Sequence, residues 1–175
     1  MARRAAADQT LGFCQGPPGC HADRVSFLVI LVHLGVGALW LGSMSYSLFV
    51  VQPRIARAVP DPGRAEELYR ELGAGNRWRV VGLIATLFVS GVLLLLIVYS
   101  GRSTLWWLAI VAKVLLLAGA SALFWWVSWR GWPRRVFALP AELPAQQARF
   151  RRVALVMTGL VGFAFVLGVA AAHLL

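Results

Sequence analysis

The stretch VSFLVILVHLGVGALWLGSMSYSLFVV, residues Val25–Val51, decides the fold, because it is a long apolar run without a carboxylate, lysine or arginine. A bilayer core about 30 Å thick is crossed by about 20 apolar residues in a helix. Three further apolar runs follow at Val80–Tyr99, Leu105–Val127 and Val153–Leu175. The sequence therefore predicts an all-α integral membrane four-helix bundle, with helices at about 25–51, 80–99, 105–127 and 153–175.

The composition agrees with this class. The chain is 59% hydrophobic and 14% charged, whereas a soluble domain is about half apolar and about a quarter charged. Residues 1–24 carry Gly16-Pro17-Pro18-Gly19 and no apolar centre, so we expect an exposed N-terminal arm rather than a cleavable signal. Residues 25–175 form the four-helix domain, and the first span acts as its own anchor.

The basic residues predict the orientation. A net charge of +10 indicates nucleic-acid binding in a soluble protein, but here the arginines gather in two of the connections. These are Arg54, Arg57, Arg64, Arg70, Arg77 and Arg79 in the first connection, and Arg130, Arg134, Arg135, Arg149, Arg151 and Arg152 in the third. Arginine-rich short loops stay in the cytoplasm. We therefore expect a multi-pass protein of the bacterial inner membrane with both termini on the outer (periplasmic) side, in contact with lipid and not with nucleic acid.

Two ionisable residues lie inside the predicted spans. His33 and Lys113, the only lysine of the chain, are each the ninth residue of their span, so both lie about 12 Å below the outer surface. A lysine inside a membrane helix costs about 2.5–3.5 kcal/mol and normally faces the bundle interior. We predict that both side chains face inward. The alternative for His33 is packing alone, through a hydrogen bond to Ser90 or Thr86.

Further candidates surround this pair. Trp40 lies on the same helix face as His33, and Arg77 opens the second span within a basic–aromatic–basic step; both are candidate cofactor-binding residues. His173, near the outer end of the fourth span, is a candidate metal ligand. In the arm, Cys14 and Cys20 either form a disulfide or, with His21, offer soft ligands suited to cuprous copper.

A family resemblance rests on three features. His33-Leu34-Gly35-Val36-Gly37-Ala38-Leu39-Trp40-Leu41-Gly42, the intramembrane Lys113 and the segment Arg149–Leu155 resemble the copper-resistance D (CopD) family of membrane proteins. The HemJ-type protoporphyrinogen oxidases share the His, Trp and Lys pattern. The resemblance implies a four-helix fold in which His33 faces a metal, either a copper ion or the iron of haem b.

Three functions follow as hypotheses. The first is a CopD-like protein that binds or transports copper at the outer side of the membrane. The second is a haem b-binding oxidoreductase or electron carrier, in which Lys113 pairs with a propionate. The third is an accessory subunit that packs against a membrane-protein partner or a second copy of itself. No Ser-His-Asp, paired-carboxylate or phosphate-loop pattern is present, so we name no catalytic residue.

Overall fold

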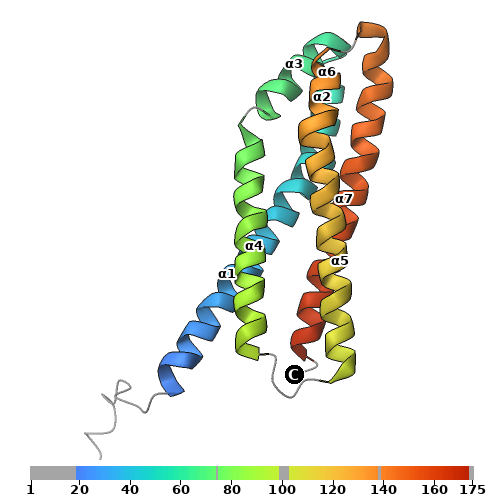
Figure 1. Cartoon of the computed structure of the whole chain (residues 1–175). Helices are drawn as coiled ribbons and strands as arrows, with labels where there is room; N and C mark the ends of the chain where they lie inside the picture. The colour runs from blue at the N-terminus through green and yellow to red at the C-terminus, as the bar shows by residue number, and fades with distance from the viewer. Residues whose placement is uncertain (1–18, 74, 99–102, 138, 174–175) are drawn as a thin grey trace, which may run out of the picture.

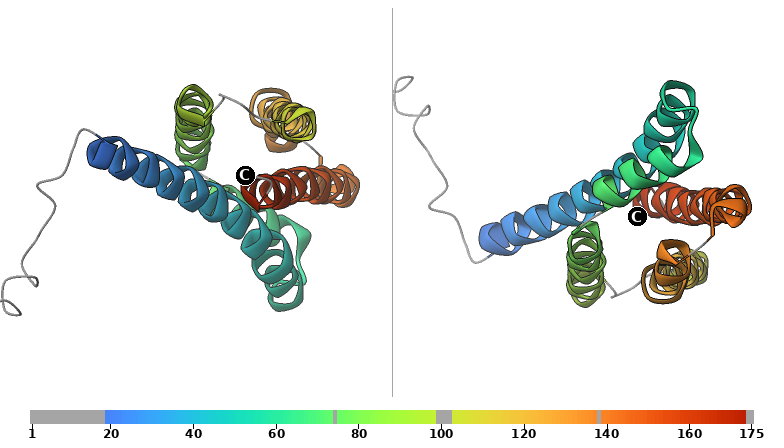
Figure 2. Two further views of the ribbon diagram at one scale, coloured as in Figure 1. Left: turned by 90° about the horizontal axis from the view of Figure 1, so that it is seen from below. Right: turned by 90° about the horizontal axis from the view of Figure 1, so that it is seen from above.

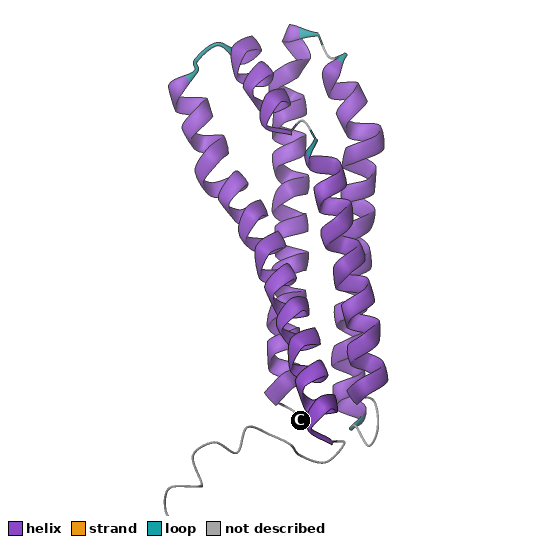
Figure 3. Cartoon of the chain, turned by 90° about the vertical axis from the view of Figure 1, so that its left-hand side faces the viewer, coloured by secondary structure: helices purple, strands orange, loops and turns teal. Residues whose placement is uncertain are grey.

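The computed structural model describes residues 19–73, 75–98, 103–137 and 139–173. Every described regular element is helical (Figure 3). In chain order they are α1 (Gly19–Tyr46), η1 (Ser47–Val51), α2 (Gln52–Ala58), α3 (Pro62–Gly73), α4 (Asn76–Val98), α5 (Thr104–Trp126), η2 (Val127–Gly131), α6 (Trp132–Val136), η3 (Pro140–Glu142) and α7 (Leu143–His173). Four helices, built on α1, α4, α5 and α7, are long and apolar enough to cross a membrane. The chain is an all-α, multi-pass membrane protein.

The core of the bundle lies where the four long helices meet. It takes one buried side chain from each of them: Trp40 from α1, Leu87 from α4, Ala120 from α5 and Val161 from α7. Large apolar side chains on the outward faces stay exposed, as with Leu115 at 67%. A soluble domain would bury such faces, whereas lipid solvates them. The bundle is therefore packed at its centre and apolar at its perimeter.

The helices pack in pairs, α1 against α4 and α5 against α7, and α1 also contacts α7. Figures 1 and 2 show α1 crossing the bundle at an angle, so that its N-terminal part leans away from the other helices. The start of α1 and the end of α7 lie at the same end of the molecule (Figure 1). The short helices α2, α3 and α6 lie at the opposite end, where the arginine-rich connections run. Which end faces outward stays a prediction.

Two prolines lie within continuing helical segments rather than at helix ends. The chain stays helical past Pro53, through α2 to Ala58. Pro53 follows the π-helical segment η1, and Pro133 likewise follows the π-helical segment η2. A proline lacks an N–H group and collides with the carbonyl four residues before it, and a wider π turn relieves both problems. The helices therefore continue past the apolar runs.

The helix α3 is amphipathic, with an exposed polar face and a buried inner face. Asp61 caps it, since its carboxylate accepts hydrogen bonds from the backbone N–H groups of Gly63 and Arg64 at 3.4 and 3.1 Å. Pro62 stands at its first position, where a missing N–H group has no cost. Its inner face is buried at Ala65 and Glu66.

Candidate functional site

His33 and Lys113 meet inside the bundle, as predicted. Lys113 Nζ of α5 lies 3.3 Å from His33 Nε2 of α1, although 80 residues separate them in the chain. Both side chains are half-buried. The pair bridges two helices that otherwise make few contacts, since α5 packs mainly on α7 and α1 mainly on α4.

Ser90 of α4 completes a directed chain of hydrogen bonds. Ser90 is buried, and its hydroxyl donates to the carbonyl oxygen of Thr86 at 2.6 Å. Its oxygen is then the acceptor for His33 Nδ1–H, which lies 2.7 Å away. This assigns the proton of the neutral imidazole to Nδ1 and leaves Nε2 to accept from Lys113. His33 thus accepts a hydrogen bond from the lysine ammonium, and the chain of hydrogen bonds continues through Ser90 to the backbone carbonyl of Thr86 in α4.

Two glycines, which no sequence pattern distinguishes from the others, make room for the pair. A Cβ atom added to Gly168 of α7 would lie 2.7 Å from Lys113 Nζ. A Cβ atom added to Gly91 of α4 would lie 3.3 Å from His33 Cε1. The lysine therefore lies against the backbone of α7, and the imidazole against that of α4. All four long helices shape the site.

A small cavity of about 40 Å³ adjoins the pair. Besides His33 and Lys113, its walls are apolar and come from each long helix, as with Gly37, Leu87, Leu117 and Phe165. A single water needs roughly 10–15 Å³ of such volume. The cavity therefore accommodates a group of the size of a carboxylate.

Trp40 lies two turns along α1 from His33. Its side chain is fully buried, and its Nε1–H has no hydrogen-bond partner among the described residues. Buried polar atoms are normally paired, so an unpaired donor beside a candidate site needs a cause. Trp40 does not line the cavity beside His33 and Lys113, and its role in binding stays a prediction.

Arg77 lies apart from this group. It is at the start of α4, 13 residues before Ser90, which corresponds to about 20 Å along the helix. Its guanidinium donates to the carbonyl oxygen of Ser128 and lies 4.8 Å from the ring centroid of Trp129. These contacts tie α4 to η2 at the arginine-rich end of the bundle. The structure does not bring Arg77 to the His33–Lys113 pair.

The remaining metal-ligand candidates are not placed with His33. Cys14 lies outside the described residues. Cys20 and His21 begin α1 and His173 ends α7, but the structure does not describe their side chains. Within the described residues, no group of three or more His, Cys, Asp or Glu side chains is arranged to hold a metal ion.

The two cofactors implied by the resemblance fit this site unequally. A cuprous ion prefers soft donors, and at His33 it would meet one imidazole nitrogen that already accepts a hydrogen bond from Lys113. A porphyrin ring does not fit inside the cavity, since sites for molecules of that size span roughly 300–1,000 Å³ and this cavity has about 40 Å³, so that of haem b only a propionate would enter it. A carboxylate fits the volume of the cavity and complements the charge of Lys113.

Comparison of the chain with protein-family models, with curated proteins and with solved structures found no match.

Proposed function

We propose that the chain is a membrane-embedded binding protein for a lipid-soluble ligand that carries a carboxylate, which pairs with Lys113. This proposal rests on the surroundings of Lys113, which hydrogen-bonds the His33 imidazole and lines a small, otherwise apolar cavity. The four predicted spans contain no Asp or Glu, and a cation in apolar surroundings is normally paired. A carboxylate in the adjoining cavity supplies the missing charge.

Each residue of the site then has a role. Lys113 binds the anionic group. His33 and Ser90 are positioning residues, because they hold the ammonium through Nε2 and fix the imidazole through Nδ1. Gly168 allows the lysine to lie against α7. The body of the ligand remains outside the small cavity, in the apolar surroundings of the helices.

The ligand class includes the porphyrins that the resemblance names. Haem b carries two propionates, and its ring chemistry when bound would make the protein an oxidoreductase or an electron carrier. Under this proposal the chain holds such a molecule by a propionate. Under this proposal the protein lies in the bacterial inner membrane with both termini outside, and the arginine distribution supports this orientation.

The test compares acids with their esters on the purified protein. The probes are protoporphyrin IX and oleic acid, with protoporphyrin dimethyl ester and methyl oleate as controls that lack the charge. The native protein should bind each acid at least about 30-fold more tightly than its ester. Removing one partner of a buried charge pair costs about 2 kcal/mol or more, and about 2 kcal/mol corresponds to this factor. The variant Lys113→Met should lose this preference.

Thr158→Val is the matched control variant. Thr158 is a polar residue of α7 whose hydroxyl donates to the carbonyl oxygen of Ala154 in its own helix, away from the cavity. This variant should keep the preference for acids. Equal binding of acids and esters by the native protein contradicts the proposal, as does an undiminished preference in Lys113→Met. The accessory-subunit hypothesis then takes its place.

Copper handling of the CopD type is the second candidate. The observation in its favour is that Met44 and Met157, partly buried, pack against the core cluster around Trp40, and thioether sulfur is a ligand for cuprous copper. Titration with cuprous ion under reducing conditions tests it, with Met44→Leu as the variant. Binding that is unchanged by Met44→Leu counts against these thioethers as ligands.

A further inference from the structure

A second and larger cavity lies at the arginine-rich end of the bundle, far from the His33–Lys113 pair. It has a volume of about 300 Å³ and lies between α2, α3 and α7. Gln52 and Pro53 of α2, Tyr69 of α3, and Gln147 and Arg151 of α7 are among its walls. Its volume reaches the lower limit of sites that hold small molecules.

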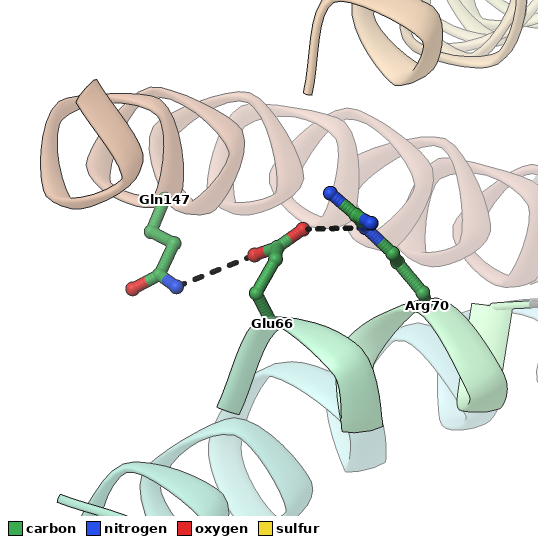
Figure 4. Close-up of polar contacts among 3 residues, drawn as sticks. All are labelled: Glu66, Arg70 and Gln147. Carbon is green, nitrogen blue, oxygen red and sulfur yellow. Dashed lines mark hydrogen bonds and ion pairs between the residues drawn. The ribbon is translucent and has the colours of Figure 1, made fainter. Parts of the chain in front are cut away.

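The chain builds this cavity with its own polar contacts. Glu66 of α3 is only 3% exposed, and its carboxylate accepts a hydrogen bond from Gln147 Nε2 of α7 at 3.3 Å. The other carboxylate oxygen lies 3.8 Å from Arg70 Nε (Figure 4). The Tyr69 hydroxyl of α3 donates to the backbone carbonyl of Gln52 in α2 at 3.2 Å. The amphipathic helix α3 is thus fixed to both α7 and α2.

The charge of the lining favours an anion. Among the described residues that line it, Arg151 alone is charged, and it is exposed at the rim. The nearby carboxylate of Glu66 is not part of the lining, because it faces Arg70 and Gln147. The amides of Gln52 and Gln147 contribute polar atoms to the walls. A guanidinium with polar neighbours matches the oxygens of a phosphate.

The depth of the cavity favours a lipid as the source of that phosphate. Gln52 directly follows the apolar residues Val50 and Val51, and Arg151 lies two residues before the apolar run that begins at Val153. Both residues therefore mark the level where the apolar spans end, which is the level of the lipid headgroups. We propose that this cavity binds the phosphate of an anionic phospholipid headgroup. This proposal stands independently of the carboxylate site at Lys113.

The experiment measures the rise in the unfolding temperature of the detergent-purified protein on titration with one of three probes. They are phosphatidylglycerol, phosphatidylcholine and inorganic phosphate. Phosphatidylglycerol should stabilise the native protein at concentrations where the other two have no effect. Arg151→Gln should weaken its apparent affinity about tenfold or more, as expected for the loss of a hydrogen bond between charged groups inside the cavity.

Two further variants separate the cavity from general attraction to arginine. Arg152→Gln makes the same charge change at an exposed neighbour that does not line the cavity, and it should leave the affinity within about twofold of native, because a solvated charge outside the cavity is screened. Ala56→Phe fills the cavity without changing the charge, because Ala56 lies in its wall, and should abolish the lipid effect. Equal losses in the two arginine variants overturn the proposal. Full stabilisation by inorganic phosphate alone overturns the lipid as the source.

Discussion

Replacement of Lys113 by methionine should stabilise the ligand-free protein while removing its preference for carboxylate ligands. Placing a lysine in a membrane helix costs about 2.5–3.5 kcal/mol, and methionine of similar length avoids this cost. The variant loses one hydrogen bond, from Nζ to His33 Nε2 at 3.3 Å. Interhelical hydrogen bonds in membranes contribute about 0.6–1.7 kcal/mol. The net expectation is a gain of about 1–3 kcal/mol in the free energy of unfolding.

The measurement is reversible unfolding of the native protein and of Lys113→Met in mixed micelles without added ligand. The control is Thr158→Val, which removes a hydroxyl that is bonded within its own helix. It should change the free energy of unfolding by less than about 1 kcal/mol. A loss of more than about 1 kcal/mol in Lys113→Met would refute the reasoning, because the lysine would then stabilise the bundle instead of serving a ligand.

Three other predictions concern the site and the topology. Gly168→Ala should weaken acid binding about tenfold or more, because its Cβ would lie 2.7 Å from Lys113 Nζ and would force the ammonium to move. Gly159→Ala is the control, since its Cβ meets nothing within 4 Å, and it should bind like the native protein in the same titration. Ser90→Ala should lower the free energy of unfolding by about 1–3 kcal/mol, because His33 Nδ1–H loses its acceptor; an unchanged value in micelle unfolding would contradict the hydrogen-bond chain. An impermeant thiol reagent applied to intact cells after mild reduction should label the native cysteines, and labelling only after lysis would reverse the orientation.

The fold could be predicted because a bilayer constrains it strongly. Runs such as Val80–Tyr99 are too long and too apolar for other roles, and helices are the structures that satisfy their backbone within lipid. The ends of the helices were less predictable. Apolar patterning alone does not show that the π-helical segment before Pro53 allows the helix to continue to Ala58.

The site was predictable only in part. His33 and Lys113 stood out because ionisable residues are costly in a membrane and these two share a depth. Gly91 and Gly168 gave no such signal, because glycine is common in membrane helices and the chain has 17. Their role depends on which side chain of the neighbouring helix lies against each glycine, and the rotation of each helix about its own axis sets this. The basic–aromatic–basic step at Arg77 made it a candidate binding residue, but its position at the start of α4 places it at the other end of the bundle.

Two charged residues of the described helices, the buried Glu66 and the half-buried Lys113, are treated in opposite ways, and this contrast is the strongest reason to assign a ligand to Lys113. Glu66 is as buried as a core residue, yet Arg70 balances its charge and Gln147 binds its second oxygen (Figure 4). Lys113 is held by a neutral imidazole, and the described residues give it no carboxylate. A buried charge kept for structure is normally compensated within the chain, because an unpaired one is strongly destabilising. The compensating charge for Lys113 is therefore expected to come from a bound molecule.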